Sequence, residues 1–218
     1  MQDMKALLSE KKIIAILRRV PAEKLDRVIL ALREGGVRFM EVTFDQSSPT
    51  CLTDTAAAIR RVGELAPDVY AGAGTVLTAE QAEAAAAAGA KYVISPDVNP
   101  AVIRRTTALG MISMPGALTP SEVLAAYREG ASYVKIFPAG DLGPAYIRAI
   151  RAPISHIPLL AVGGVDLDNM ADFFRAGICG FGIGGNILKK DLLARDDYAG
   201  LTELAARYTA RAAELTKG

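Results

Sequence analysis

The chain has 218 residues, with 25 basic and 24 acidic side chains and a formal net charge of +1 at pH 7. No basic patch or acidic tail stands out, so composition gives no case for a nucleic-acid partner or a membrane surface. The length allows a large buried core, and one α/β barrel commonly needs roughly 200–250 residues.

Neither the start of the chain nor its cysteines indicate export. The opening stretch, MQDMKALLSEKK, contains Asp3 and Glu10, lacks the apolar core of a signal peptide, and predicts a short amphipathic helix that closes one end of the domain. The longest charge-free run, 106–121, is shorter than the roughly 20 residues of a membrane-spanning helix. Cys51 and Cys179 are too few for a disulfide framework and lack metal-binding spacing, so we expect a cytoplasmic protein.

One unit recurs along the chain: a helical segment, a glycine, and a run of β-branched or aromatic residues. A left-handed glycine just past a helix is a common way to end it. The strand-like runs number eight and comprise residues 12–18, 38–44, 68–74, 91–96, 110–116, 133–139, 158–164 and 180–185.

The segments between these runs have helical patterns. In AEKLDRVILALREG, Leu25, Val28, Ile29 and Leu32 recur at helical spacing. Similar patterns occupy 49–65, 78–90, 119–130, 166–177 and the last helices within 187–218. Candidate N-caps for two of these helices are Thr119, and Asp166 or Asp168.

Strictly alternating β and α segments imply parallel strands joined by crossover helices. Eight such strands in a chain of this length predict a closed (β/α)8 TIM barrel with a short N-terminal helix. A doubly wound open sheet is the alternative. No linker or change of composition interrupts the chain, so we expect a single barrel domain over 1–218.

A lone lysine lies in the otherwise apolar run YVKIFPA, 133–139. Strand alternation places Lys135 on one face with Tyr133 and Phe137. A buried ammonium is costly unless it is paired or neutralised. A desolvated lysine amine is nucleophilic near neutral pH, as Schiff-base chemistry on a carbonyl requires. Taken alone, Lys135 is more simply a solvated edge-strand residue or half of a structural ion pair, and the remaining residues reverse this preference.

The active site of such a barrel lies at the carboxyl ends of its strands. The residues predicted at those ends, in chain order, are Arg18, Glu41, Thr43, Gly74, Thr75, Ser95, Pro96, Pro115, Gly116, Lys135, Gly163, Gly164, Gly184, Gly185 and Asn186.

Glu41 is the second residue that indicates chemistry. In FMEVTF, 39–44, it shares one strand face with Thr43. Strands two and six lie across an eight-stranded barrel from each other, so Glu41 and Lys135 can converge near the axis. The alternative is a structural salt bridge. A barrel core is normally filled by branched apolar residues, and both charges fall at the catalytic end, which favours a functional pair.

Two glycine pairs indicate a phosphate site. Barrels of this type frequently bind phosphate with the loops after strands seven and eight. Gly163-Gly164 and Gly184-Gly185-Asn186 fall at those two places. Glycines let backbone N–H groups approach an anion, and the N-terminus of a following helix adds a favourable dipole.

Other kinds of site find no support. The only histidine, His156, precedes strand seven and belongs to the opposite face, where we expect packing or exposure. Without a second histidine or a cluster of acidic or cysteine ligands, we expect no metal. No Gly-x-Gly-x-x-Gly opens a helix after the first strand, so we expect no dinucleotide cofactor and no cofactor of another kind.

Several stretches resemble one family, the pyruvate-dependent class I aldolases that act on 2-keto-3-deoxy-6-phosphogluconate and 4-hydroxy-2-oxoglutarate. The similar stretches, in the family's order, are AILR (15–18), MEVT (40–43), AGAGTVL (71–77), ISP (94–96), PGALTPSE (115–122), VKIFPA (134–139), AVGGV (161–165) and GIGGN (182–186).

The resemblance implies a lyase of carbohydrate metabolism, in the Entner–Doudoroff route, that assembles as a homotrimer. It implies that Lys135 forms the Schiff base and Glu41 is the general acid and base. It also implies that Thr75 and Pro96 line the pyruvate end and that the late glycines, with Asn186, hold the phosphate. The candidate substrate-binding residues are Arg18, Thr43, Thr75, Pro96 and Phe137.

Two positions depart from the pattern of the phosphogluconate enzymes. Their carboxylate-binding arginine, two positions after the threonine of Glu-Val-Thr, is replaced here by Asp45, and the threonine before the strand-seven glycines is replaced by Val162. AILR and AVGGV resemble the phosphogalactonate enzymes more closely, in which an arginine at the end of strand one contacts substrate. Arg18 is the candidate for that contact, and the preferred epimer stays open.

The expected reaction is retro-aldol cleavage to pyruvate and glyceraldehyde 3-phosphate, or to pyruvate and glyoxylate with hydroxyoxoglutarate. A phosphosugar isomerase or epimerase, with Glu41 as base and Lys135 as an electrostatic clamp, is one alternative. This alternative is weakened because the sequence offers no second positioned acid or histidine for such chemistry. A non-catalytic phosphosugar-binding protein is another, but it gives no simple reason for Lys135 and Glu41 to occur together.

Overall fold

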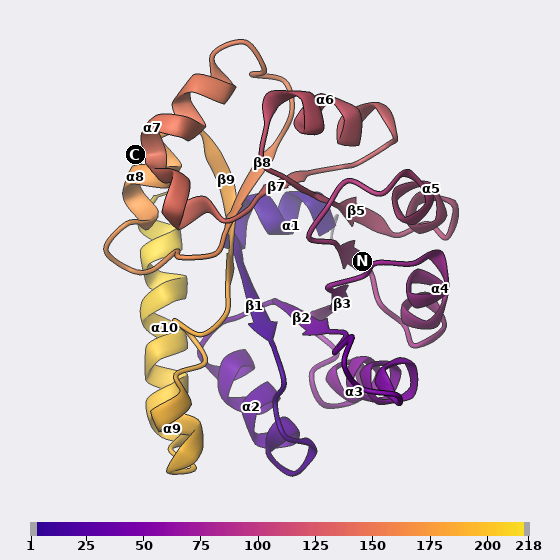
Figure 1. Cartoon of the computed structure of the whole chain (residues 1–218). Helices are drawn as coiled ribbons and strands as arrows, with labels where there is room; N and C mark the ends of the chain where they lie inside the picture. The colour runs from indigo at the N-terminus through magenta and orange to yellow at the C-terminus, as the bar shows by residue number, and fades with distance from the viewer. Residues whose placement is uncertain (1–3, 216–218) are drawn as a thin grey trace.

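The computed structural model describes residues 4–215 as a parallel β/α barrel (Figure 1). The strands are β1 (Ile13–Leu17), β2 (Phe39–Thr43), β3 (Tyr70–Gly74), β4 (Tyr92–Ile94), β5 (Ile112–Met114), β6 (Gly116–Ala117), β7 (Val134–Ile136), β8 (Leu159–Val162) and β9 (Ile178–Ile183). The helices are α1 (Met4–Lys11), α2 (Ala22–Glu34), α3 (Cys51–Leu65), α4 (Ala79–Ala87), α5 (Pro100–Ala108), α6 (Pro120–Arg128), α7 (Ala139–Arg151), α8 (Met170–Arg175), α9 (Lys190–Ala194) and α10 (Tyr198–Glu214). The prediction of a TIM-type barrel is confirmed.

The fifth predicted strand, 110–116, was expected to be continuous and is instead divided. The hydrogen-bonded order is β5-β4-β3-β2-β1-β9-β8-β7-β6, so β5 and β6 stand at its two ends although they follow one another in the chain. Pro115 separates them because proline has no N–H to donate to a ladder. Its carbonyl still accepts from the Lys135 backbone N–H at 2.8 Å, and the ring of strands closes there.

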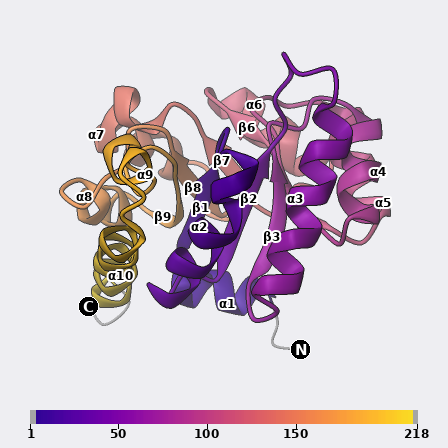
Figure 2. The ribbon, with the colours of Figure 1, turned by 90° about the horizontal axis from the view of Figure 1, so that it is seen from below.

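The ends of the chain cover the barrel floor and one flank. Helix α1 lies beneath the strands, at the bottom of the view in Figure 2. Its Leu7 and Leu8 are buried against residues of the barrel interior, so the predicted closing helix is confirmed over Met4–Lys11. Residues 1–3 and 216–218, which the sequence also assigned to terminal helices, lie outside the described residues. The eighth strand begins at Ile178, two residues earlier than expected.

Local sequence signals account for several helix starts. At α6, the Thr119 hydroxyl accepts from the Glu122 backbone and the Glu122 carboxylate accepts from the Thr119 backbone, which confirms Thr119 as N-cap. The prediction of Asp166 or Asp168 as the N-cap of α8 is wrong, because the N-cap is Asn169 and no side chain caps this helix. The Asp166 carboxylate instead accepts from the backbone N–H groups of Asp168 and Asn169 and so stabilises the turn that precedes the helix.

Strand alternation divides the apolar residues between two cores. The larger core joins the outer strand faces to the helices and includes Met40, Val42, Val134 and Ile136. The second fills the barrel and consists of Leu7, Leu8, Ile14, Phe39, Tyr92, Ile94, Met114, Tyr133 and Leu160. Phe39 and Tyr133 each precede a charged residue by two positions, so Glu41 and Lys135 point into the barrel above this interior core.

Gly72 of β3 is predicted to be essential for packing the barrel interior. A Cβ on Gly72 would overlap the buried ring of Tyr92, and overpacking of this kind typically costs about 1–3 kcal/mol. We expect Gly72→Ala to lower the free energy of unfolding by that amount, measured by urea denaturation. Gly63→Ala is the matched control, because a Cβ there meets no atom within 4 Å and Gly63 lies within α3, where alanine is the better helix former. Equal stability of the two variants would contradict the prediction.

Candidate active site

Lys135 and Glu41 are buried at the carboxyl ends of strands from different parts of the ring. Lys135 lies in β7 and is 7% exposed, and Glu41 lies in β2 and is 2% exposed. Strand β7 pairs with β6 on one side and β8 on the other, so Lys135 is not an edge-strand residue. The interpretation of a solvated edge lysine is therefore wrong.

Burial makes the Lys135 amine easier to deprotonate. Desolvation lowers the pKa of Lys135 from its usual value. The negative charge of Glu41 opposes this effect, the positive charge of Arg18 adds to it, and Asp97 opposes it more weakly. Among residues 4–215 no hydrogen bond or ion pair holds the Lys135 Nζ, which lies over the Phe137 ring with the centroid 4.9 Å away. The amine is thus free to react with a ligand in the barrel mouth.

The carboxyl group of Glu41 is pushed toward its protonated form. Desolvation raises the pKa of Glu41, while the positive charges of Lys135 and Arg18 lower it. Its Oε2 atom is fully buried and has no hydrogen-bond partner among the described residues. A buried carboxyl group whose pKa is raised and whose oxygen has no fixed partner has the features of a candidate proton-transfer group.

The two groups influence each other's titration but form no direct ion pair within residues 4–215. A structural salt bridge between Glu41 and Lys135 is therefore not observed.

Glycines of β3 provide room for the Glu41 side chain. A Cβ at Gly74 would overlap the Glu41 carboxylate, and a Cβ at Gly72 would overlap the Tyr92 ring. Sequence analysis placed Gly74 at a strand end but missed this role, and it missed Tyr92 altogether. The available signal was the alternation Gly-Ala-Gly in 72–74, beside a strand whose inward face carries a charge.

The glycine pairs come together around one cavity of about 490 Å³. Its wall is formed by residues from β1, β8, β9 and the loops that follow them, and comprises Ile16, Arg18, Phe137, Val162, Gly163, Gly164, Val165, Gly182, Gly184, Gly185 and Asn186. Gly163 and Gly164 have φ values of 84° and 72°, which L side chains rarely adopt. The expected convergence of the two glycine pairs is thus present.

Two details of this cavity differ from expectation. Neither glycine pair leads directly into a helix, because α8 begins only at Met170 and α9 only at Lys190. The helix that contacts the first glycine pair is α7, in which the Gly140 N–H donates to the Gly163 carbonyl at 2.7 Å. The Asn186 side chain donates to the Val165 carbonyl at 2.8 Å. Its amide nitrogen therefore links the two loops rather than pointing freely into the cavity.

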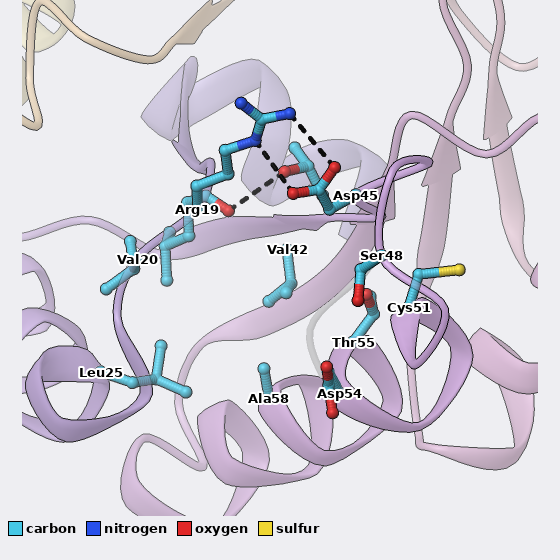
Figure 3. A pocket seen from close by; sticks show the side chains of 12 residues that line it. Arg19, Val20, Leu25, Val42, Asp45, Ser48, Cys51, Asp54, Thr55 and Ala58 are labelled. Carbon is cyan, nitrogen blue, oxygen red and sulfur yellow. Dashed lines mark hydrogen bonds and ion pairs between the residues drawn. The ribbon is translucent and has the colours of Figure 1, made fainter.

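Arg18 and Arg19 follow β1 and have different partners. Arg18 is exposed and lines the glycine cavity, and the described residues offer it no hydrogen bond or ion pair. Arg19 pairs with Asp45 through two contacts, Nε to Oδ2 at 3.0 Å and Nη2 to Oδ1 at 3.2 Å (Figure 3). The Arg19 backbone is left-handed, with φ of 52°. The two arginines both line a pocket of about 260 Å³ at the rim, but only Arg19 is held in an ion pair.

Asp45 is neutralised at the rim of the site. Hydrogen bonds from the Ser47 hydroxyl and backbone, together with Arg19, lower the pKa of Asp45 to about 2. The pocket beneath this pair, of about 340 Å³, lies on the outer side of β2, where Val42, Leu25 and Ala58 form its apolar walls (Figure 3). The Arg19–Asp45 pair also borders a pocket of about 260 Å³ that Arg18, Thr43 and Thr75 line, so it lies at the rim between the two pockets.

The other residues predicted to bind substrate surround the barrel mouth. The Thr43 hydroxyl donates to the Leu17 carbonyl at 3.4 Å. Thr75, with φ of 55°, has its carbonyl held by the Gln46 side chain at 2.7 Å. Pro96 follows β4, and its carbonyl lies so close to Gly116 that a Cβ there would stand 2.5 Å from the oxygen. Phe137 is partly exposed beside Lys135.

The remaining observations concern other kinds of site. His156 is exposed and packs edge-on against the Tyr127 ring, with centroids 5.5 Å apart, which confirms its expected packing role. Within residues 4–215 no three His, Cys, Asp or Glu side chains gather as metal ligands would. None of the helices described is both long and apolar enough to cross a membrane.

A β/α barrel with a buried amine, a buried carboxyl group and a glycine-lined cavity at one mouth has the architecture of a barrel enzyme that acts on small anionic molecules. A sequence model of the family described as KDPG and KHG aldolase matches residues 4–204, and the chain belongs to this family.

Relatives support the same assignment. The chain is 42% identical over 188 residues to a Rhizobium meliloti protein described as a probable 2-dehydro-3-deoxy-6-phosphogalactonate aldolase, covering 86% of each chain. It is 36% identical to the 2-dehydro-3-deoxy-phosphogluconate aldolase of Treponema pallidum, covering 87% of this chain and 90% of the relative. A solved structure titled as native KDPGal superimposes with a TM-score of 0.84 at 30% identity, over 94% of this chain and 96% of the other. The predicted family of lyases is confirmed.

Proposed function

We propose that the protein is a class I aldolase that cleaves a 2-keto-3-deoxy-6-phospho acid of six carbons, the gluconate or its galactonate epimer, into pyruvate and glyceraldehyde 3-phosphate. The observation that carries this proposal is the buried, unpaired Lys135 amine facing the barrel mouth with Glu41 in electrostatic reach. The names of the Rhizobium meliloti and Treponema pallidum relatives support the substrate class.

The reaction begins at Lys135. Its unprotonated amine attacks the C2 ketone, and the resulting carbinolamine loses water to give an iminium. Burial lowers the pKa of Lys135 and so increases the fraction of free amine, in line with catalytic lysines tuned to roughly 7–8. The iminium can accept an electron pair, which the ketone does less readily.

Glu41 moves the protons. It takes the proton of the C4 hydroxyl while the C3–C4 bond breaks, and the bonding pair moves into the iminium to form an enamine. Glyceraldehyde 3-phosphate leaves, the enamine is protonated at C3, and water hydrolyses the new iminium to pyruvate and free Lys135. The raised pKa of Glu41 suits a group that must both accept and return a proton.

The glycine cavity holds the phosphate in this proposal. Backbone groups around Gly163-Gly164 and Gly184-Gly185 approach the anion, and Arg18, which has no partner in the described chain, adds charge. Remote binding of the phosphate helps to position the reacting carbons. Val162 offers no hydroxyl to contact the substrate, so we expect weak discrimination between the two epimers.

Three further features rest on family resemblance. We place the protein in the cytoplasm, assembled as a homotrimer, and with secondary activity on 4-hydroxy-2-oxoglutarate. That substrate would use the same lysine and carboxyl group, and it would leave the glycine cavity without a phosphate to bind.

Schiff-base formation is predicted at Lys135. Treatment with pyruvate and borohydride should add one reduced pyruvyl group per chain, and peptide mass spectrometry should map it to the peptide that contains Lys135. Lys135→Met should take up no label, because methionine fills a similar volume without an amine. Labelling at another lysine, or no labelling of the folded wild-type protein, would refute the proposed chemistry.

Glu41→Gln should lose turnover and keep the fold. General acid–base catalysis contributes typically about 10²–10⁴-fold, so we expect kcat to fall by that factor.

Because burial raises the pKa of Glu41, the wild-type fold loses stability as pH rises through the range in which this carboxyl ionises. The variant should therefore be at least as stable as wild type at pH 8, measured by thermal unfolding. Near-normal turnover of the variant would contradict the acid–base role and would mean that Glu41 is a structural residue.

Phosphorylated substrates should be preferred. We expect higher kcat/KM for the two six-carbon phospho acids than for hydroxyoxoglutarate, with a lower kcat as well as weaker binding when the phosphate is missing. Side-by-side kinetics on the three substrates test this. Equal or better efficiency with hydroxyoxoglutarate would mean that the glycine pairs form turns and no phosphate site.

The adjacent arginines give a matched control for this preference. Arg18→Ala should raise KM for the phosphorylated substrates, because it removes the unpaired cation that lines the cavity. Arg19→Ala removes an exposed guanidinium already paired with Asp45 and should change KM little. An equal effect of both substitutions would indicate a general loss of positive charge rather than a contact.

A further inference from the structure

Two buried polar atoms stand out in the barrel interior. Within residues 4–215, only Glu41 Oε2 and the Tyr92 hydroxyl are fully buried side-chain oxygen or nitrogen atoms without a hydrogen-bond partner. An unpaired polar group in a protein interior is costly, and the great majority of buried polar atoms are paired. Tyr92 is 0% exposed, and a phenylalanine would fill the same space without that cost.

The two residues occupy one row of the sheet. Glu41 on β2 is the register partner of Gly72 on β3, and Gly72 is the register partner of Tyr92 on β4. Strands are spaced by about 4.8 Å, so the Cα atoms of Glu41 and Tyr92 lie roughly 10 Å apart. Both side chains point into the barrel, and the residue between them has no side chain.

The glycines of β3 let the two polar ends approach each other. The Tyr92 ring lies across Gly72, and the Glu41 carboxylate lies over Gly74, so a Cβ at either glycine would overlap its neighbour. The Glu41 carboxylate is close enough to the Tyr92 hydroxyl for its negative charge to raise the pKa of the phenol. A donor and an acceptor that both lack partners thus face the same small space.

We propose that Tyr92 is a positioning residue for the acid–base group: its hydroxyl donates a hydrogen bond to Glu41 Oε2, directly or through one bound water, in the working enzyme. This inference rests on the proposed function in that it assigns Glu41 the acid–base role. It leaves Oε1 as the oxygen that exchanges the substrate proton. Tyr92 keeps its own proton throughout, and no covalent step involves it.

The surrounding charges define what this hydrogen bond does. Burial, and then the negative charge of Glu41, raise the pKa of Tyr92 well above its usual value, so the phenol remains a donor. The groups that face Glu41 from other elements are Lys135 on β7, Arg18 after β1 and Tyr92 on β4. Lys135 and Arg18 stabilise the carboxylate by charge, and the phenol does so by donation.

The test is the titration of Glu41 in Tyr92→Phe. Protein labelled with ¹³C at glutamate carboxyl carbons is titrated by NMR, and the Glu41 signal is assigned by its loss in Glu41→Gln. Removing a donor to the carboxylate disfavours the charged form, so the Glu41 midpoint should move to higher pH by about one unit. An unchanged midpoint in folded Tyr92→Phe would overturn the proposal.

Tyr133→Phe is the matched control. Tyr133 belongs to the same interior core, and its hydroxyl donates to the Lys5 carbonyl at 3.5 Å, near the floor of the barrel. Its removal should leave the Glu41 midpoint in place. An equal shift in both variants would attribute the effect to general loosening of the interior and would also overturn the proposal.

Kinetics separate this inference from the proposed function. In an active aldolase, the acid limb of the kcat/KM profile should move upward with Tyr92→Phe in parallel with the NMR midpoint, with kcat reduced by up to about tenfold. A limb that stays in place while the midpoint moves would overturn the positioning role. If pyruvate trapping at Lys135 fails, the proposed function fails, and the NMR titration still decides whether Tyr92 bonds to Glu41.

Discussion

The site depends on keeping two buried ionisable groups near each other without a bond between them. Burying an ion costs several kcal/mol unless close partners compensate it. In this barrel, burial lowers the pKa of Lys135 and raises the pKa of Glu41, so both groups move toward their neutral forms. A free amine and a carboxyl group that can hold a proton are also the forms that Schiff-base chemistry uses. The cost to the fold and the reactivity of the site therefore have the same physical origin.

The glycines at positions 72 and 74 of β3 make this arrangement possible. Barrel interiors are usually filled by layers of branched apolar residues, and below Glu41 the interior core follows that rule. At the level of the site, two positions of β3 carry no side chain because they are occupied by Gly72 and Gly74. The Tyr92 ring and the Glu41 carboxylate occupy the freed volume. A polar group thus replaces apolar filling only where the neighbouring strand makes room for it.

The alternation of eight strand-like and helical segments was sufficient to predict the barrel. Period-two alternation within the strands was sufficient to predict the inward direction of Glu41 and Lys135, because strand geometry leaves each side chain only two faces. What the sequence could not supply depends on contacts between distant segments. The Arg19 ion pair joins the ends of β1 and β2, and the Asn186 amide bonds to a loop after β8. The row that joins Glu41 to Tyr92 requires the register of three strands, which alternation alone does not define.

The aspartate at position 45 shows how charge is redistributed at the rim. Arg18, Arg19 and Asp45 together carry a net charge of +1, because the ion pair between Arg19 and Asp45 is neutral. The remaining charge is that of Arg18, at the glycine cavity. Because surface charges are screened over about 8 Å at physiological ionic strength, a cation acts on an anionic ligand mainly from within the cavity wall. The Arg19–Asp45 pair is not part of the glycine-cavity wall, and it borders a second pocket of about 260 Å³ that Arg18 also lines. Arg18 therefore belongs to both places, and the neutral pair adds no net charge to either.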